Sequence, residues 1–128
     1  NRIIKSSLLH DVIVYGDKQA LKQAIRIFID NAIKYTKDGD TISISCENED
    51  EDCIITVKDT GIGMSRKDLN NVFERFYRSD QVRNNKIYGH GLGLSIAKLI
   101  ILGHTGKIKV RSQLTKGTSV IVTLPRRF

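Results

Sequence analysis

A single carboxylate stands at the end of an apolar run in IITVKDTGIGMS, residues 54–65, directly before two closely spaced glycines. If the run is a strand, Asp59 shares a face with the apolar Ile55 and Val57, because side chains alternate along a strand. A buried ionised carboxylate is costly unless a partner satisfies it. Two interpretations stay open. Asp59 closes its own D-x-G turn, or it accepts a hydrogen bond from a ligand that the glycines let the backbone approach.

A second group of residues suited to ligand binding is the glycine run in YGHGLGLSIAK, residues 88–98. Gly89, Gly91 and Gly93 lead directly into an expected helix, and free amides at a helix start bind phosphate with help from the helix dipole. A Rossmann site needs a strand directly before its glycines, whereas a long charged segment precedes these. The sequence also has no GxxxxGK[ST] motif. The pattern therefore favours a phosphate-binding lid hinge and excludes a P-loop enzyme.

Two further clusters could contact a metal ion or phosphate groups. Asn31 lies at the rim of an expected apolar helix stripe, with Lys34 and Tyr35 as its neighbours three and four residues on. This cluster is either an oxygen ligand for Mg²⁺ with a lysine for phosphate, or a solvated helix edge. In FERFYR, residues 73–78, one arginine could clamp a transferring phosphoryl group. The alternative is aromatic packing followed by two solvated arginines.

The elements that would position these groups follow from apolar periodicity and its breaks. Apolar residues recur at helical spacing in one segment with Asp17 as the expected N-cap, and in another with Gly103 as the expected C-cap. Alternating segments indicate strands, two of them forming an antiparallel hairpin through an acidic loop, residues 47–52. A shorter helix begins after an expected N-cap, Ser65. The expected helices are 17–36, 65–77 and 91–103, the expected strands 41–46, 53–59, 107–112 and 118–124, and the segment 78–91 is a lid or disordered loop.

Length and composition fit one domain of this kind. The chain has 128 residues, of which 40% are hydrophobic, so it can build one core. No apolar run reaches membrane-spanning length, and no signal peptide opens the sequence. The elements predict an α/β (α+β) two-layer sandwich, with a mixed, largely antiparallel sheet covered on one face by about three helices.

Charge and cysteine content narrow the possible partners. A net charge of +7 suggests a polyanionic partner, but the basic residues are spread and are not interleaved with aromatic ones, which disfavours nucleic acid. Cys46 and Cys53 lie on successive apolar segments without a CxxC motif or a nearby histidine. We therefore expect two reduced core cysteines of a cytosolic protein rather than a metal site or a disulfide.

Each motif alone is weak, but their order is specific. The Asn31 helix, D-x-G-x-G, F-x-x-F-Y-R, G-x-G-L-G-L and a closing G-T-x-x-x-x-x-L-P follow one another from about Val14 to Pro125. Together they resemble the catalytic, ATP-binding domain of bacterial sensor histidine kinases, which has the Bergerat ATP-binding fold shared with gyrase and some chaperones. The resemblance implies an ATP-dependent protein histidine kinase that uses ATP and Mg²⁺ and phosphorylates a histidine on another domain.

The resemblance also implies roles for individual residues. Asn31 is similar to the Mg²⁺ ligand, Asp59 to the acceptor for the adenine amino group, and Thr118 to a hydroxyl that supports the adenine side. Arg78 is similar to the clamp on the γ-phosphate, which with Asn31 makes the catalytic pair. The implied nucleotide contacts are Asn31, Lys34, Tyr35, Asp59, Gly61, Ile62, Gly63, Arg78, Lys86, Gly89, His90, Gly91, Leu92, Gly93, Leu94 and Thr118.

The sequence departs from the family pattern at a few positions. Ile27 stands where the family often has an asparagine and where hydrolytic relatives have a glutamate, so self-contained hydrolysis is disfavoured and Mg²⁺ has one protein ligand fewer. His90 replaces a frequent threonine, and HTG at 104–106 replaces the usual HGG. Rival interpretations are a nucleotide-binding regulatory module without transfer activity and a basic nucleic-acid-binding domain.

The resemblance finally implies how the chain is organised. His10, His90 and His104 lack the flanking residues of an acceptor helix. We therefore expect residues 1–128 to be a single ATP-binding catalytic domain, a fragment whose acceptor histidine lies elsewhere in a longer protein. The expected partners are the acceptor (dimerisation) domain of the same protein and a downstream response regulator, with no nucleic acid and no direct membrane contact. The expected location is the cytoplasmic side of a membrane-bound sensor kinase.

Overall fold

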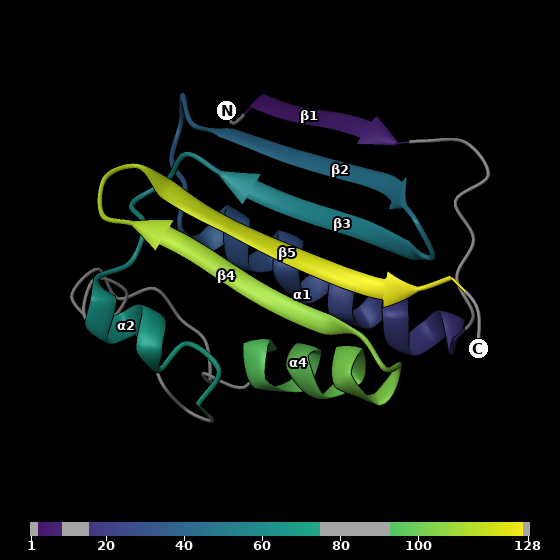
Figure 1. Cartoon of the computed structure of the whole chain (residues 1–128). Helices are drawn as coiled ribbons and strands as arrows, with labels where there is room; N and C mark the ends of the chain where they lie inside the picture. The colour runs from purple at the N-terminus through teal and green to yellow at the C-terminus, as the bar shows by residue number, and fades with distance from the viewer. Residues whose placement is uncertain (1–2, 9–15, 75–92, 127–128) are drawn as a thin grey trace.

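The computed structural model describes residues 3–8, 16–74 and 93–126, which form one sheet with helices against it (Figure 1). In chain order the elements are β1 (Ile3–Leu8), α1 (Lys18–Lys34), β2 (Thr41–Glu49), β3 (Asp52–Asp59), α2 (Arg66–Asn70), α4 (Gly93–Gly103), β4 (Lys107–Gln113) and β5 (Gly117–Pro125). Within the described residues, no helix is both long enough and apolar enough to cross a membrane.

The sheet has the strand order β1-β2-β3-β5-β4. β1 runs parallel to β2, and the other neighbouring strands are antiparallel, as expected of a mixed, largely antiparallel sheet. The last strand of the chain, β5, therefore lies between β3 and β4. This insertion pairs Asp59 at the end of β3 with Thr118 near the start of β5.

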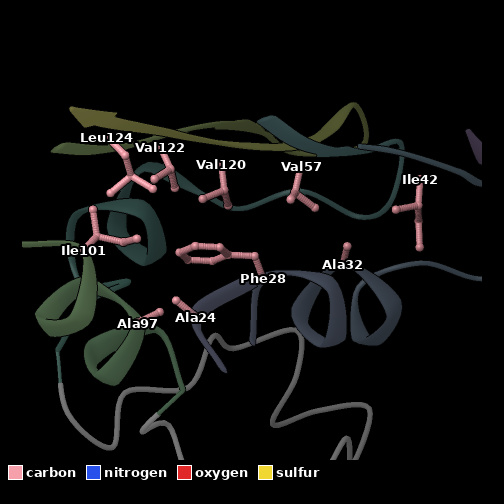
Figure 2. Close-up of a cluster of buried hydrophobic side chains, with 10 residues drawn as sticks. All are labelled: Ala24, Phe28, Ala32, Ile42, Val57, Ala97, Ile101, Val120, Val122 and Leu124. Atoms are coloured by element: carbon pink, nitrogen blue, oxygen red, sulfur yellow. The ribbon is translucent and has the colours of Figure 1, made fainter. Parts of the chain in front are cut away.

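The core lies between the sheet and the two longer helices, α1 and α4, on one face of it (Figure 1). Figure 2 shows the ring of Phe28 in the layer between α1 and the sheet, where it is 1% exposed. The buried cluster consists of Ala24, Phe28, Ala32, Ile42, Val57, Ala97, Ile101, Val120, Val122 and Leu124. α2 lies beside the end of β4 (Figure 1), so the expected two-layer sandwich with about three helices is confirmed.

The expected helix starts are confirmed by their capping contacts. The carboxylate of Asp17 accepts hydrogen bonds from the amides of Gln19 and Ala20, at 3.0 and 3.1 Å. The hydroxyl of Ser65 accepts one from the amide of Asp68 at 3.1 Å. Each side chain satisfies amides that a helix start leaves without a partner inside the helix. α2 ends at Asn70, well before the expected end at residue 77.

Two further details of the expected elements are wrong. The first is the acidic loop expected over 47–52, which is a two-residue turn, because Asn48 and Glu49 continue the backbone ladder of β2 opposite Cys53 and Asp52. Backbone pairing does not require apolar side chains, so the acidic residues gave no sign that the strands continue to the turn.

The second is the expected C-cap of α4. Gly103 is still part of the helix, and the left-handed residue after it is Thr105, with a φ of 61°. The amides of Thr105 and Gly106 donate to the carbonyls of Leu102 and Ile101, at 3.0 and 2.9 Å. These two bonds are the Schellman pattern, which satisfies the last carbonyls of the helix two residues later than expected.

Candidate functional site

The carboxylate of Asp59 is buried at the end of β3, where it is 4% exposed. Its Oδ1 accepts a hydrogen bond from the amide of Gly61 at 2.9 Å. Burial raises the pKa of Asp59 and the charge of Asp40 adds to this, while backbone hydrogen bonds from Gly61 and Thr118 act in the opposite direction. Asp59 thus closes its own turn and is also a buried carboxylate, so the two interpretations of the sequence are compatible.

The loop that follows Asp59 is joined to the end of α1. The amide of Ile62 donates to the carbonyl of Tyr35 at 3.0 Å. A Cβ added at Gly61 would lie 2.0 Å from this same carbonyl oxygen and 3.1 Å from Oδ1 of Asp59. Only glycine fits there, because real Cβ atoms do not come so close to a backbone oxygen. The end of the α1 helix and the D-x-G-x-G loop, which lie far apart in sequence, are therefore in direct contact.

The same loop is held on its other side by the β4–β5 turn. Gly63 has a φ of 70°, and a Cβ there would lie 2.0 Å from the carbonyl oxygen of Gln113. The amide of Thr115 donates to the carbonyl of Ile62 at 2.8 Å. The sequence suggested that Gly61 and Gly63 let a ligand approach the backbone; in the structure, a backbone carbonyl oxygen also occupies the place that a Cβ would take at each of them. These two glycines are required by the fold itself.

Ser112 is a residue of this site that the sequence analysis missed. Its hydroxyl accepts from the amide of Met64 at 2.8 Å, donates to the carbonyl of Gly117 at 3.0 Å, and lies 2.7 Å from the hydroxyl of Thr118. A serine hydroxyl has one proton, so Thr118 must be the donor in the last bond and keeps its own lone pairs. The register could have revealed this, because Ser112 and Thr118 flank the turn QLTKG and pair directly across it.

The polar end of α1 carries three more of the predicted site residues. Asn31 and Tyr35 are half-buried and Lys34 is exposed. Ile27, one turn before Asn31, packs against the core cluster. A Cβ on Gly93 would lie 3.3 Å from Cγ2 of Ile27, so the start of α4 lies beside this turn of α1. The last glycine of the run thus lies beside the turn of α1 that precedes Asn31.

The side chains that could ligate a metal ion at this site suit only one way of binding Mg²⁺. Among the described residues, no three His, Cys, Asp or Glu side chains gather into a metal site. Asn31 offers one amide oxygen, and the position one turn earlier is apolar. Mg²⁺ keeps several waters and is commonly shared between one or two protein oxygens and nucleotide phosphates. The residues present fit that arrangement and not an all-protein cage.

Several predicted site residues lie outside the described residues: Arg78, Lys86, Gly89, His90, Gly91 and Leu92. Gly93 and Leu94 form the first turn of α4, and both are half-buried. The described part of FERFYR includes Phe73, whose ring lies 4.9 Å from the ammonium of Lys98. This cation–π contact links the segment after α2 to α4.

Comparison with known proteins agrees with this geometry. Residues 16–127 match the family model described as "Histidine kinase-, DNA gyrase B-, and HSP90-like ATPase". Over 111 residues the chain is 49% identical to "Sensor protein SrrB" of Staphylococcus aureus, an alignment that covers 86% of this chain and 19% of the relative. The chain thus spans about a fifth of the length of the curated relatives it matches.

Solved structures with a similar fold are also those of kinases. "Mycobacterial sensor histidine kinase MprB" is 28% identical with a TM-score of 0.85, covering 98% of this chain and 84% of that one. A nucleotide-free "Catalytic domain of histidine kinase ThkA" is 25% identical with a TM-score of 0.84, covering 99% and 82%. Full-length ShkA in complex with AMPPNP shares the fold at 24% identity, with a TM-score of 0.81, and covers 97% of this chain and 25% of that one.

Proposed function

The chain belongs to the histidine kinase-, DNA gyrase B- and HSP90-like ATPase family, and we propose that it is the catalytic domain of a sensor histidine kinase. It binds ATP with Mg²⁺ and transfers the γ-phosphoryl group to a histidine of an acceptor domain. The observation that carries the proposal is the buried carboxylate of Asp59, paired with Thr118 and joined through its loop to the Asn31 end of α1.

The adenine side of the proposed site is built around Asp59. An ionised carboxylate only accepts hydrogen bonds, so it suits the exocyclic amino group of adenine and repels the carbonyl that guanine has at that place. The hydroxyl of Thr118, with its own proton directed to Ser112, has lone pairs for a further donor. Gly61, Ile62 and Gly63 form the loop beside the base.

The phosphate side combines residues of α1 with the glycine run. Asn31 offers an oxygen to Mg²⁺, which when bound neutralises charge on the phosphates. Lys34 and Lys86 add positive charge, and Tyr35 stands at the end of α1 between the phosphate and base sides. The glycine run supplies backbone amides to the phosphates from residues 89–94. Arg78 stabilises the charge that develops on the phosphoryl group, and catalysis consists of positioning and charge stabilisation.

The transfer step needs a nucleophile from outside this domain. A ring nitrogen of the acceptor histidine bonds to the γ-phosphorus, the bond to the β,γ-bridging oxygen breaks, ADP leaves, and the imidazole proton passes to solvent. His104 is no candidate, because its Nε2 accepts from the amide of Asp17 at 3.0 Å and its Nδ1 donates to the carbonyl of Ile100 at 2.8 Å.

The remaining parts of the proposal concern the parent protein. The acceptor histidine lies in a dimerisation domain of the same protein, and a response regulator takes the phosphoryl group next. Residues 1–128 act as one catalytic domain on the cytoplasmic side of a membrane-bound sensor kinase. The support is the similarity to sensor kinases, of which this chain covers only a part.

Two measurements test the proposal. Calorimetric titration with a non-hydrolysable ATP analogue, with and without Mg²⁺, should show binding that Mg²⁺ strengthens. Incubation of γ-labelled ATP with the chain and the parent's acceptor domain should then give an acid-labile, alkali-stable phosphohistidine on that domain. Nucleotide binding without any transfer would make the chain a regulatory module, and absence of nucleotide binding would overturn the proposal altogether.

A further inference from the structure

The two cysteines of the chain lie side by side in the β2–β3 hairpin. The Sγ atoms of Cys46 and Cys53 are 3.3 Å apart, and both thiols are free. Cys46 pairs with Ile55 in the register and Cys53 pairs with Asn48, so the two cysteines are diagonal neighbours on the core-facing side of the two strands. The sequence predicted two reduced core cysteines, and the structure places these two free thiols in contact as one dithiol.

The backbone holds this dithiol in place. The ladder between β2 and β3 is continuous from Ile42 opposite Asp59 to Glu49 opposite Asp52, and it closes in the turn at 50–51. A disulfide bond is about 2.05 Å long, so the sulfurs need to approach by about 1.2 Å, a movement within reach of side-chain rotation. Strand separation is thus not required for the two sulfurs to meet.

The two thiols differ in their exposure to solvent. Cys53 is 1% exposed, whereas Cys46 is half-buried. Burial raises the pKa of the Cys53 thiol to about 12, with further contributions from its hydrogen bond to Cys46 and from the charge of Cys46, and Arg126 acts in the opposite direction. Cys46 is therefore the thiol that a reagent in solution reaches first, and the buried Cys53 reacts second, with Cys46 itself.

A positive charge lies at the same end of the hairpin. The backbone amide of Arg126 donates to the carbonyl of Glu51 at 2.8 Å, and its guanidinium donates to the carbonyl of Asp50 at 3.3 Å. Arg126 is thus fixed over the turn next to Cys53. Its charge favours the thiolate that Cys53 must become if it is to attack another sulfur.

We propose that Cys46 and Cys53 form a reactive dithiol site that small aliphatic disulfides convert to an intramolecular disulfide bond. The thiolate of Cys46 attacks one sulfur of the reagent, forms a mixed disulfide and releases one thiolate. Cys53 then loses its proton to solvent, attacks the Sγ of Cys46 and releases the second thiolate. Two electrons and two protons pass from the protein to the reagent, which leaves as two thiols.

The test uses the folded chain and 2-hydroxyethyl disulfide as the oxidant. After reaction, remaining thiols are blocked and the protein is cut at Glu47, Glu49 and Glu51, which separates the cysteines unless a disulfide joins them. The expected product of the wild-type chain is a joined peptide pair, two mass units lighter than the reduced pair, which separates on reduction. A mixed disulfide should not accumulate, because the second thiol is held beside it.

Single variants provide the matched controls. Cys53→Ser should stop at a mixed disulfide on Cys46, and Cys46→Ser should react with the reagent at least about tenfold more slowly, because Cys53 is buried. Circular dichroism verifies that each variant is folded, and the joined peptide in the wild type does not depend on any variant. Accumulation of a mixed disulfide in the wild type, disulfide-linked dimers as the main product, or no reaction of the folded wild-type chain would each overturn the proposal.

Discussion

The carbonyl of Tyr35 accepts a 3.0 Å hydrogen bond from the amide of Ile62, which fixes the end of α1 against the loop after β3. Tyr35 follows Asn31 by one helical turn, and Ile62 lies in the loop that begins at Asp59. One backbone bond thus joins the residues proposed for the phosphate side of the nucleotide to those proposed for the base. The distance between the two sides is set by the fold and not by the ligand.

The first prediction concerns the base. Asp59→Asn should weaken binding of the ATP analogue by about 1.5–3 kcal/mol, because an amide presents a donor to the amino group of adenine and a buried contact to a charged group is lost. The wild-type chain should bind GTP much more weakly than ATP. Calorimetric titration measures both. Equal affinities of the wild-type chain for ATP and GTP would contradict the role of Asp59.

The second prediction concerns the pH dependence of stability. Burial raises the pKa of Asp59 above its ordinary value of 3.8, so folding favours the protonated carboxyl. The stabilisation is fully present below the unfolded-state pKa and is lost as the pH rises through the folded-state pKa. The amide of the Asp59→Asn variant does not titrate, so this variant does not lose that stabilisation as the pH rises. The difference in free energy of unfolding, variant minus wild type, should therefore increase between about pH 3.5 and pH 7. Urea unfolding at matched pH values measures this difference, and a flat or falling difference speaks against it.

The third prediction concerns Ser112. Ser112→Ala removes the acceptor for the Met64 amide and for the Thr118 hydroxyl, which should cost about 1–3 kcal/mol of stability. Urea unfolding measures the loss. Ser119→Ala is the matched control, because it changes a half-buried serine on the opposite face of the sheet and should stay within about 0.5 kcal/mol of the wild type. Similar losses in both variants would remove the special role of Ser112.

The fourth prediction concerns the end of α4. Gly103 is helical, and a Cβ there would meet nothing within 4 Å, so Gly103→Ala should stabilise the chain by about 0.5–1 kcal/mol. Gly106→Ala is the opposite case, because its Cβ would lie 2.8 Å from the carbonyl oxygen of Thr123, and it should destabilise. Thermal unfolding of the two variants should shift in opposite directions. Destabilisation by Gly103→Ala would show that Gly103 is needed where it stands.

The fifth prediction concerns the chain alone. Ile27 is packed against the core one turn before Asn31, so nothing at that position can activate water. The isolated chain should bind ATP and release phosphate very slowly, with little label retained on itself. A phosphate-release assay measures this. Rapid hydrolysis would place the chain with the hydrolytic branch of its family instead.

Local signals predicted most of the fold. Apolar periodicity and the caps Asp17 and Ser65 located the starts of α1 and α2, and alternation located β2, β3, β4 and β5. The parallel strand β1 was not predicted, because its place depends on backbone pairing with β2, which lies beyond α1 in the chain. The end of α4 was misplaced because the left-handed position is taken by Thr105, a residue that propensity alone disfavours there.

The residues of the candidate site were predictable from their types and spacing, but most of the contacts between them were not. The burial of Asp59 followed from strand alternation, and its position at a strand end followed from where the apolar run stops. The role of Ser112 and the contact between Cys46 and Cys53 depend on strand register, which is set by turn geometry and by the packing of the whole sheet. The place of a Cβ at Gly61 and at Gly63 is taken by carbonyls from segments distant in sequence, and no local pattern reveals such neighbours.

The insertion of β5 between β3 and β4 has a consequence for synthesis on the ribosome. β3 and β4 emerge first, and the strand that joins them emerges last. Until then a nascent chain has open sheet edges and part of its apolar face without a partner, the condition in which chains associate wrongly or recruit chaperones. Thr118 arrives with that same strand, so Asp59 gains its cross-strand partner in the very step that completes the sheet.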